Sequence, residues 1–166
     1  MFESIFWTII SGVAVFVVSQ LVLELCIKPY REYRDIKYRI SNKLKYYSNL
    51  ITNPLNLLEP VENLFTTVTK TRQDDLQEIN RKEVLDYYLK TSSEMRKLSC
   101  DLETGYFNNL DLIRKIFIKE DLQDIDKASS LLIRISNCLF EPRMALQNGK
   151  DIDEIKKHLN LKSINN

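Results

Sequence analysis

Apolar residues fill one long segment near the start of the chain, from Ile5 to Ile27, in which only Glu24 carries a formal charge. About 20 helical residues, at roughly 1.5 Å each, cover the hydrocarbon thickness of a bilayer. A core helix of a soluble domain usually keeps a polar stripe, whereas residues 6–18 contain only two side chains with hydroxyl groups. The pattern predicts one transmembrane helix, and we assign residues 1–28 to an anchor.

Basic residues lie almost wholly on the carboxyl side of this segment. Glu3 stands before it, and seven basic residues follow it closely: Lys28, Arg31, Arg34, Lys37, Arg39, Lys43 and Lys45. The positive-inside rule therefore predicts that the amino terminus lies outside the cytoplasm and that the carboxyl-terminal domain is cytoplasmic. A cleaved signal peptide would carry basic residues before its apolar core, so we expect the anchor to stay uncleaved. Four basic residues are candidates for contact with anionic lipids: Lys28, Arg31, Arg34 and Lys37.

Polar side chains inside the anchor raise the question of contact between copies of the chain. The amide of Gln20 lies deep in the apolar segment, and a second copy of the helix offers it a partner for a gain of about 0.6 to 2 kcal/mol. Gly12 and Ser19 allow close approach on a neighbouring stripe. Glu24 has a simpler explanation, because it can pair with Lys28 one turn later. The other interpretation is that the membrane tolerates this single glutamine without a partner, in which case the anchor stays monomeric.

A second helix is predicted over residues 29–53, where apolar residues recur at spacings of three and four. These residues are Tyr33, Ile36, Ile40, Leu44, Tyr47 and Ile51. Pro29 either begins this juxtamembrane amphipathic helix or kinks one that continues from the anchor, and Asn53 before Pro54 ends it. The apolar stripe either lies on the membrane or packs into the domain, and the aliphatic spacing favours packing. Residues 54–72, which are rich in threonine, are predicted as a loop or a short helical insertion.

Helical periodicity continues through residues 73–162, which we assign to a bundle. Its longest apolar seam has alternating spacings of four and three: Val84, Tyr88, Thr91, Met95, Leu98 and Leu102. The seam falls short of the roughly three to four heptads typical of a coiled coil, so packing within the bundle is favoured over a dimer. The chain is thus predicted to be all-α, with one N-terminal transmembrane helix followed by a small cytoplasmic bundle of four or five helices.

Helix ends within the bundle are predicted from three local patterns. Gly105 is expected to break or cap the helix that carries the seam. Asp121 with Asp124 is typical of an amino-terminal cap for a further helix. Asp151 with Glu154 resembles a capping box that opens the last helix.

Composition and charge argue against several kinds of functional site. The chain has three glycines, one histidine and three cysteines, too few for a glycine-rich phosphate loop or for a zinc site with about three or four ligands. His158 near a helix end is explained by a capping role. Residues 46–166 contain 17 basic and 19 acidic side chains, a net charge of −2, so the positive surface that nucleic acid demands is not expected. We predict no catalytic residue, no cofactor, no metal and no nucleic-acid partner.

Four stretches of the chain carry a resemblance to known proteins: IISGVAVFVVSQLVLELCIKPYREYRDIKYRISNKLKYYSNLITNP, MRKLSCDL, IDKASSLLIRISNCLF and DEIKKHLNL. Together they resemble a group of small bacterial single-pass membrane proteins with an amino-terminal anchor, a proline-marked juxtamembrane helix and a helical cytoplasmic domain. The segment from about Leu55 to Lys82 looks longer than is usual for that group. The group has no assigned reaction, so the resemblance implies an architecture and no activity.

Together with this resemblance, the observations predict a bitopic protein of the bacterial inner membrane with a periplasmic amino terminus. Its cytoplasmic bundle is expected to be a non-catalytic module for protein interaction or self-assembly. Its partners would be the lipid bilayer and either a second copy of the chain or another protein. One alternative is a membrane effector of a bacterial antiphage defence system, which oligomerises and perturbs the membrane. The other is a membrane-tethered hydrolase, which would require polar residues that converge in one cleft.

Overall fold

The computed structural model describes residues 2–55 and 73–161, and every regular element in these ranges is helical. The all-α prediction is confirmed for this part of the chain. Most of the predicted loop or insertion, residues 56–72, lies outside the described residues. In chain order the elements are α1 (Phe2–Val22), η1 (Leu23–Ile27), α2 (Lys28–Tyr46), α3 (Ser48–Thr52), α4 (Gln73–Phe107), α5 (Asp111–Phe117), α6 (Leu122–Cys138), η3 (Pro142–Met144) and α7 (Ala145–His158).

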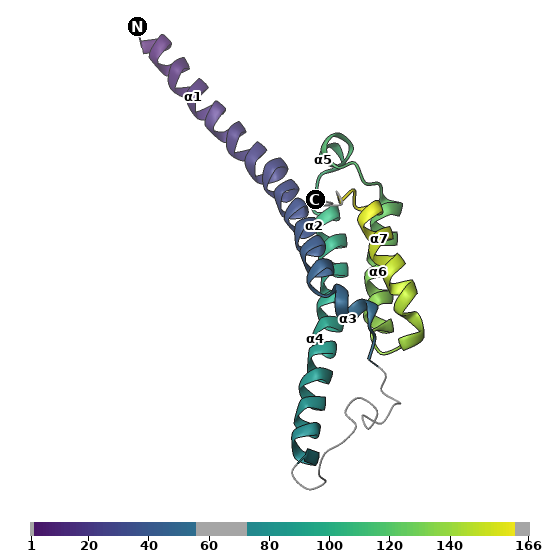
Figure 1. Cartoon of the computed structure of the whole chain (residues 1–166). Coiled ribbons are helices and arrows are strands. Elements are labelled where there is room, and N and C mark those ends of the chain that lie inside the picture. Colours follow the sequence, from purple (N-terminus) through teal and green to yellow (C-terminus); the bar gives the residue numbers. More distant parts are fainter. Residues whose placement is uncertain (1, 56–72, 162–166) are drawn as a thin grey trace, which may run out of the picture.

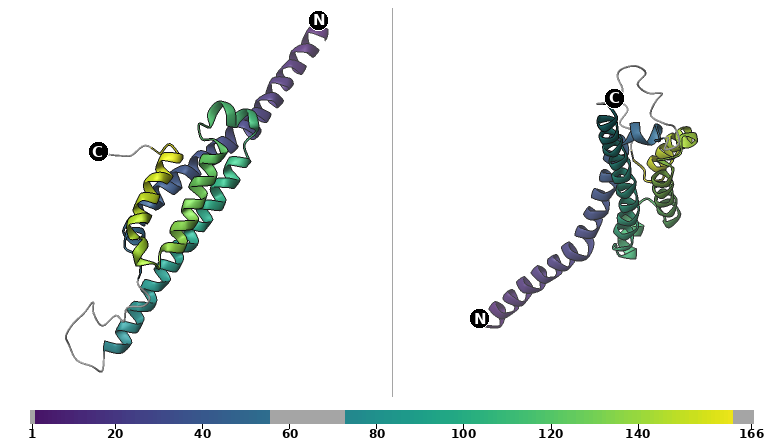
Figure 2. Two further views of the ribbon diagram at one scale, coloured as in Figure 1. Left: turned by 90° about the vertical axis from the view of Figure 1, so that its right-hand side faces the viewer. Right: turned by 90° about the horizontal axis from the view of Figure 1, so that it is seen from below.

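One long helix joins the apolar segment to the bundle, because α1 continues through η1 into α2 without a break. Pro29 has no N–H group, and its ring crowds the carbonyl of the residue four positions earlier. The chain accommodates it with the π-helical turn η1, where the Lys28 N–H donates to the Leu23 carbonyl. Such a turn is a recognised cause of helix bending, and Figure 2 shows the helix bending as it reaches the bundle. Pro29 therefore kinks a continuous helix and does not begin a new one.

The stripe predicted over residues 29–53 packs into the bundle. Its six apolar residues are all buried in α2, at Tyr47 and in α3: Tyr33, Ile36, Ile40, Leu44, Tyr47 and Ile51. They join the same core as the seam of α4, which is buried from Thr91 to Leu102. The intramolecular interpretation is confirmed for the stripe of residues 29–53 and for the part of the seam from Thr91 to Leu102, whereas Val84 at the start of the seam is exposed. As a result, α1 projects from the bundle while α2 forms part of its core (Figure 1).

Two pairs of serines join α4 to α6, which run antiparallel side by side (Figures 1 and 2). The hydroxyl oxygens of Ser99 and Ser129 lie 2.6 Å apart, and those of Ser92 and Ser136 lie 2.9 Å apart. On each helix the two serines are seven residues apart, so they share one face. Their small side chains let the helices approach closely, and the apolar residues beside them, such as Met95, fill the core.

Two of the predicted helix ends differ in the structure. Gly105 lies inside α4, where a Cβ atom would collide with Ile36 Cδ1. Its small size therefore serves the packing of α4 against α2, and the helix ends two residues later. The predicted cap at Asp121 and Asp124 is confirmed as a capping box. The last helix begins at Ala145, six residues before the box expected at Asp151.

Candidate functional site

The helix that opens the chain is long and apolar enough to cross a membrane. The continuous helix covers 42 residues from Ile5 to Tyr46, and none of its most apolar window is buried inside the structure. A core helix of a soluble domain would be mostly buried, because its apolar side chains pack against other elements. The described side chains of α1 are exposed throughout, including large apolar ones such as Trp7 and Phe16.

The three residues predicted for self-association stay on the open surface of this helix. Gln20 is exposed, and its side-chain amide makes no hydrogen bond to a described residue of its own chain. A Cβ atom on Gly12 would meet nothing within 4 Å. The Ser19 hydroxyl donates to the Val15 carbonyl at 2.7 Å, so its hydrogen-bonding need is met within the helix. Of the three, only Gln20 is left with an amide that needs a partner from outside the chain.

The four basic residues predicted to contact lipid fall into two groups. Lys28, Arg31 and Arg34 are exposed on the first turns of α2, and Lys28 pairs with Glu24 as expected. Lys37 points into the bundle instead, where its ammonium bonds Glu120 and only 16% of its side chain is exposed. The structure therefore leaves the first three available to headgroups and uses Lys37 inside the fold.

Glu120 is a buried carboxylate that joins three parts of the chain at the anchor end of the bundle. It accepts hydrogen bonds from the Lys37 ammonium (2.5 Å), the Tyr33 hydroxyl (3.2 Å) and the side-chain amide of Asn160 (3.2 Å). Burial, followed by the nearby charge of Glu120, raises the pKa of Tyr33 far above its usual range. Sequence reasoning missed Glu120 because its two partners in α2 precede it by more than 80 residues.

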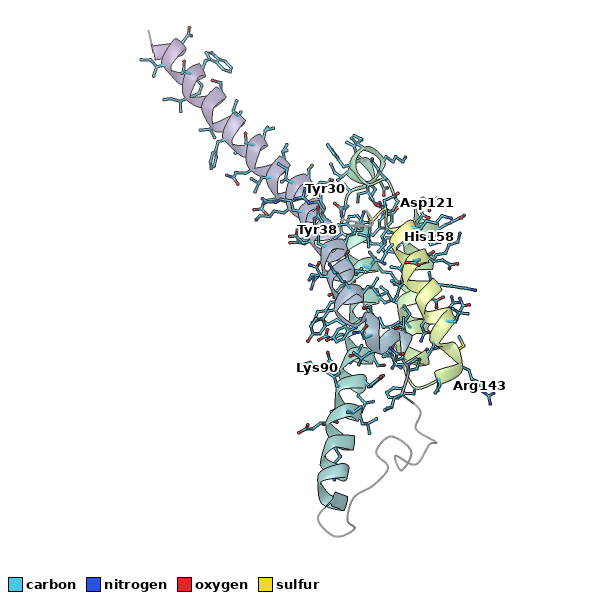
Figure 3. All side chains as sticks on the ribbon, viewed as in Figure 1. Tyr30, Tyr38, Lys90, Asp121, Arg143 and His158 are labelled. Atoms are coloured by element: carbon cyan, nitrogen blue, oxygen red, sulfur yellow. The ribbon has the colours of Figure 1, made fainter. Side chains whose placement is uncertain are left out.

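His158 lies near the same end of the bundle (Figure 3), where it forms a second polar contact, with Asp124. The imidazole Nδ1 lies 2.8 Å from Asp124 Oδ1. This hydrogen bond, together with the one inside the capping box, lowers the pKa of Asp124. His158 is the last residue of α7, as expected for a capping role, but the structure adds a bond to α6 that the sequence did not predict.

Apolar side chains are also exposed on and around the short helix α5. Ile113 and Ile118 are buried beneath it, whereas Leu112 is 66% exposed and Ile116 is 61% exposed. The full exposed set is Phe107, Leu110, Leu112, Ile116, Phe117 and Leu122, which we call the α5 surface. The sequence marks this region as very apolar, but a helix of seven residues can bury only one face.

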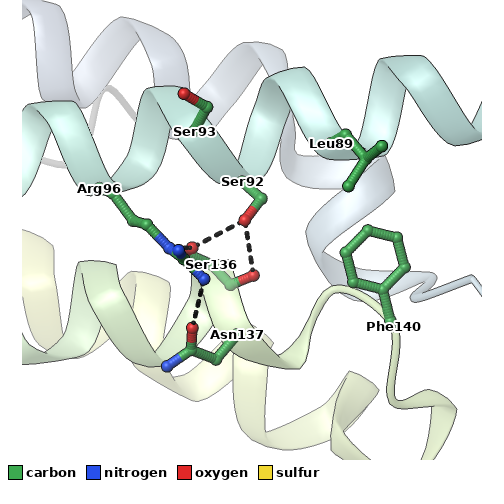
Figure 4. A pocket seen from close by; sticks show the side chains of 7 residues that line it. All are labelled: Leu89, Ser92, Ser93, Arg96, Ser136, Asn137 and Phe140. Carbon is green, nitrogen blue, oxygen red and sulfur yellow. Dashed lines mark hydrogen bonds between the residues drawn. The ribbon is translucent and has the colours of Figure 1, made fainter.

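A cleft of about 350 Å³ lies between α4 and α6 (Figure 4). Ser92, Ser136 and Arg96 meet in it, with Arg96 Nε donating to Ser136 Oγ at 2.8 Å. A serine nucleophile needs a neighbouring base, and a guanidinium cannot accept a proton. Among the described residues that line the cleft there is neither histidine nor carboxylate.

The only histidine of the chain does not reach this cleft. His158 binds Asp124, and twelve residues of α6 separate Asp124 from Ser136, which is about 18 Å along a helix axis. The polar groups of the cleft are thus bonded to each other in a way that ties α4 to α6. Within residues 2–55 and 73–161, no three His, Cys, Asp or Glu side chains are grouped so that they could hold a metal ion.

Comparison with protein-family models, with curated proteins and with solved structures finds no match to this chain. The resemblance to small bacterial single-pass membrane proteins therefore stays a prediction. The site described above stands on the geometry of this chain alone.

Proposed function

We propose that the chain is a single-pass protein of the bacterial inner membrane, with its amino terminus in the periplasm and a cytoplasmic bundle of four or five helices that acts by binding and not by catalysis. The observation that carries this proposal is the continuous helix of residues 5–46. Its first half offers an exposed apolar surface, and its second half supplies core residues such as Ile40 and Leu44. Association of anchors would therefore act directly on the packing of the bundle.

We expect movements of this helix to change the contacts at the anchor end of the bundle. Tyr33 and Lys37 lie within three turns of the end of the anchor and both bond Glu120. A rotation of α2 would move these groups away from the Glu120 carboxylate. Because that carboxylate is buried, water could not readily replace the lost hydrogen bonds. Assembly in the membrane would in this way be coupled to the end of the bundle where α2, α6 and α7 meet.

Self-association is supported by the unpaired amide of Gln20 in an otherwise apolar setting, because hydrocarbon offers it no hydrogen-bonding partner. The test uses Cys26, which lies at the inner end of the anchor and is a free thiol. In a chain that also carries Cys100→Ser and Cys138→Ala, mild oxidation of native membranes should link two copies through Cys26. Replacement of Gln20 by leucine should reduce the linked dimer strongly.

The matched control is Val18→Leu, on a position about 160° around the helix from Gln20, which should leave the yield of dimer unchanged. Equal yields in the Gln20→Leu and Val18→Leu chains would show that Gln20 is not the contact. No dimer in any of the chains would remove self-association and leave a different protein as the binding partner.

A defence effector that perturbs the membrane is a second candidate, and the unpaired amide of Gln20 supports it, since assembled anchors are what it would need. Overexpression of the full chain should then damage the membrane, and Gln20→Leu should abolish the damage. Unchanged toxicity in that variant would count against the effector. A tethered hydrolase has less support, because the described lining of the cleft around Ser92 and Ser136 provides no base.

A further inference from the structure

The α5 surface lies at the end of the bundle from which the anchor leaves. Figures 1 and 2 both show α5 on the side of the bundle nearest the amino-terminal helix. The ring of Phe117 lies 5.7 Å from the ring of Tyr30, centroid to centroid. The side-chain amide of Asn109 donates to the Pro29 carbonyl at 3.4 Å. The segment that carries α5 is thus fixed to the first residues that follow the anchor.

Packing within the bundle does not explain why this segment carries so many large apolar side chains, because most of them are exposed. Leu112 and Ile116 are one helical turn apart, so they share one face, and both are more than half exposed. The face with Ile113 packs inward. Large apolar residues that are gathered on one exposed surface indicate a site of contact with a membrane or with another protein.

The charges beside the α5 surface include the exposed carboxylates of Asp111 and Asp121 together with several basic side chains. Lys115 and Lys119 are exposed and make no ion pair with another described residue. Arg114 is bonded to Asp111 and lies over the ring of Tyr106, 5.2 Å from its centroid. Lysines next to exposed leucine, isoleucine and phenylalanine are typical of segments that lie in the plane of the headgroups, with the apolar side chains at the acyl boundary.

We propose that α5 inserts its exposed apolar side chains into the inner leaflet beside the anchor, with phospholipid as the ligand. This inference rests on the proposed function in one respect, since it requires that α1 crosses the same bilayer. Continuity with the anchor favours lipid as the occupant: Phe117 already contacts Tyr30, three residues after the apolar segment ends. The insertion gives the bundle a second point of attachment and fixes its orientation on the membrane.

Quenching of tryptophan by lipids with brominated acyl chains tests the insertion, because it requires contact with the bromine atoms. The full chain is reconstituted in vesicles of phosphatidylcholine and phosphatidylglycerol with and without bromine. The wild-type chain has one tryptophan, Trp7, which reports on the anchor. A chain with Trp7→Phe and Ile116→Trp reports on the α5 surface, and Leu112→Trp in the same background serves as a second variant should the first fail to fold.

The matched control is Leu146→Trp in the Trp7→Phe background. Leu146 is 75% exposed and begins α7 at the end of the bundle away from the anchor. The tryptophans at positions 7 and 116 should lose most of their emission in brominated vesicles, and the one at position 146 should keep it. The emission from position 116 should also be shifted to the blue relative to that from position 146.

Three other outcomes would overturn the inference or its basis. Emission from position 116 that is blue-shifted but unquenched would show a cover of protein, either a second copy or another partner, and would overturn it. Unquenched and unshifted emission would show a surface in water and would overturn it equally. Absence of quenching at Trp7, with quenching kept at position 116, would contradict the spanning anchor and with it the insertion of α5 beside that anchor, and would leave only a contact of α5 with lipid.

Discussion

The Nζ atom of Lys37 lies 2.5 Å from Oε1 of Glu120, although 83 residues separate the two in the chain. The pair joins α2, the direct continuation of the anchor, to the segment between α5 and α6. The Glu120 carboxylate is almost wholly buried, and the Lys37 side chain is mostly buried. Removal of one partner of such a buried pair lowers the stability of the fold strongly, because the other partner is left as an uncompensated buried charge.

Replacement of Glu120 by alanine should lower the free energy of unfolding by about 3 kcal/mol, since Lys37 and the Tyr33 hydroxyl would lose their shared partner. Chemical denaturation of the full chain in detergent, followed by circular dichroism, measures the change. Asp126→Ala is the control, because Asp126 is exposed on α6 and makes no ion pair with another described residue. Equal unfolding of the two variants would mean that Glu120 does not hold this end of the bundle together.

The serine pairs predict that the same substitution at two neighbouring positions of α6 has different effects on stability. Ser129 is buried against Ser99, whereas Ser130 is exposed. Ser129→Leu should force α4 and α6 apart and destabilise the bundle by about 1 to 3 kcal/mol, the usual cost of overpacking. Ser130→Leu should change the stability little. Thermal unfolding of the two variants decides the matter, and a stable Ser129→Leu chain would contradict the close contact.

Acid should weaken the bundle through two carboxylates. A hydrogen bond from Lys43, followed by one from Tyr47, lowers the pKa of Glu94, and the bond to His158 lowers the pKa of Asp124. A carboxylate with a lower pKa in the folded than in the unfolded state adds stability above its unfolded pKa of about 4. That stability is lost as the pH falls through the lower, folded pKa.

The urea midpoint of the full chain in detergent should therefore fall as the pH is lowered from about 5 to about 2. Glu94→Gln should be less stable at neutral pH and should show a smaller further loss in acid, because one of the two carboxylates has been removed. An unchanged pH profile in that variant would show that the bond from Lys43 to Glu94 contributes nothing to stability.

Cys100 provides a test of orientation, because its thiol is exposed on the bundle. A membrane-impermeant maleimide should fail to label Cys100 in intact spheroplasts and should label it after lysis, since the bundle is proposed to face the cytoplasm. Cys26→Ser and Cys138→Ala make the reaction specific. Labelling of intact spheroplasts would reverse the proposed orientation.

Periodicity predicted the helices and most of the core, because residues such as Ile40, Leu98 and Leu132 are buried on faces that repeat every three or four positions. The contacts between helices were harder to find. Ser92 with Ser99 and Ser129 with Ser136 do repeat at seven residues, and this pattern of small residues on two helices could have indicated their close approach.

Contacts made by single polar residues could not be predicted from local patterns. Asp151 has the spacing of a helix cap, yet it lies inside α7, fully buried, and accepts from the Arg134 guanidinium on α6. The α5 region is apolar in sequence, yet most of its large apolar side chains are exposed. Its exposure depends on the length of α5 and on where the anchor leaves the bundle, and neither is encoded in a pattern of neighbouring residues.

The proposal that α1 crosses a bilayer is tested most directly by washing membranes with alkaline carbonate after expression of the full chain. The wild-type chain should stay in the membrane pellet, and a chain with Val13→Arg and Val17→Arg should move to the supernatant, because two charges in the apolar segment oppose insertion. Recovery of the wild-type chain in the supernatant as a folded, monodisperse protein would contradict the anchor and everything proposed from it.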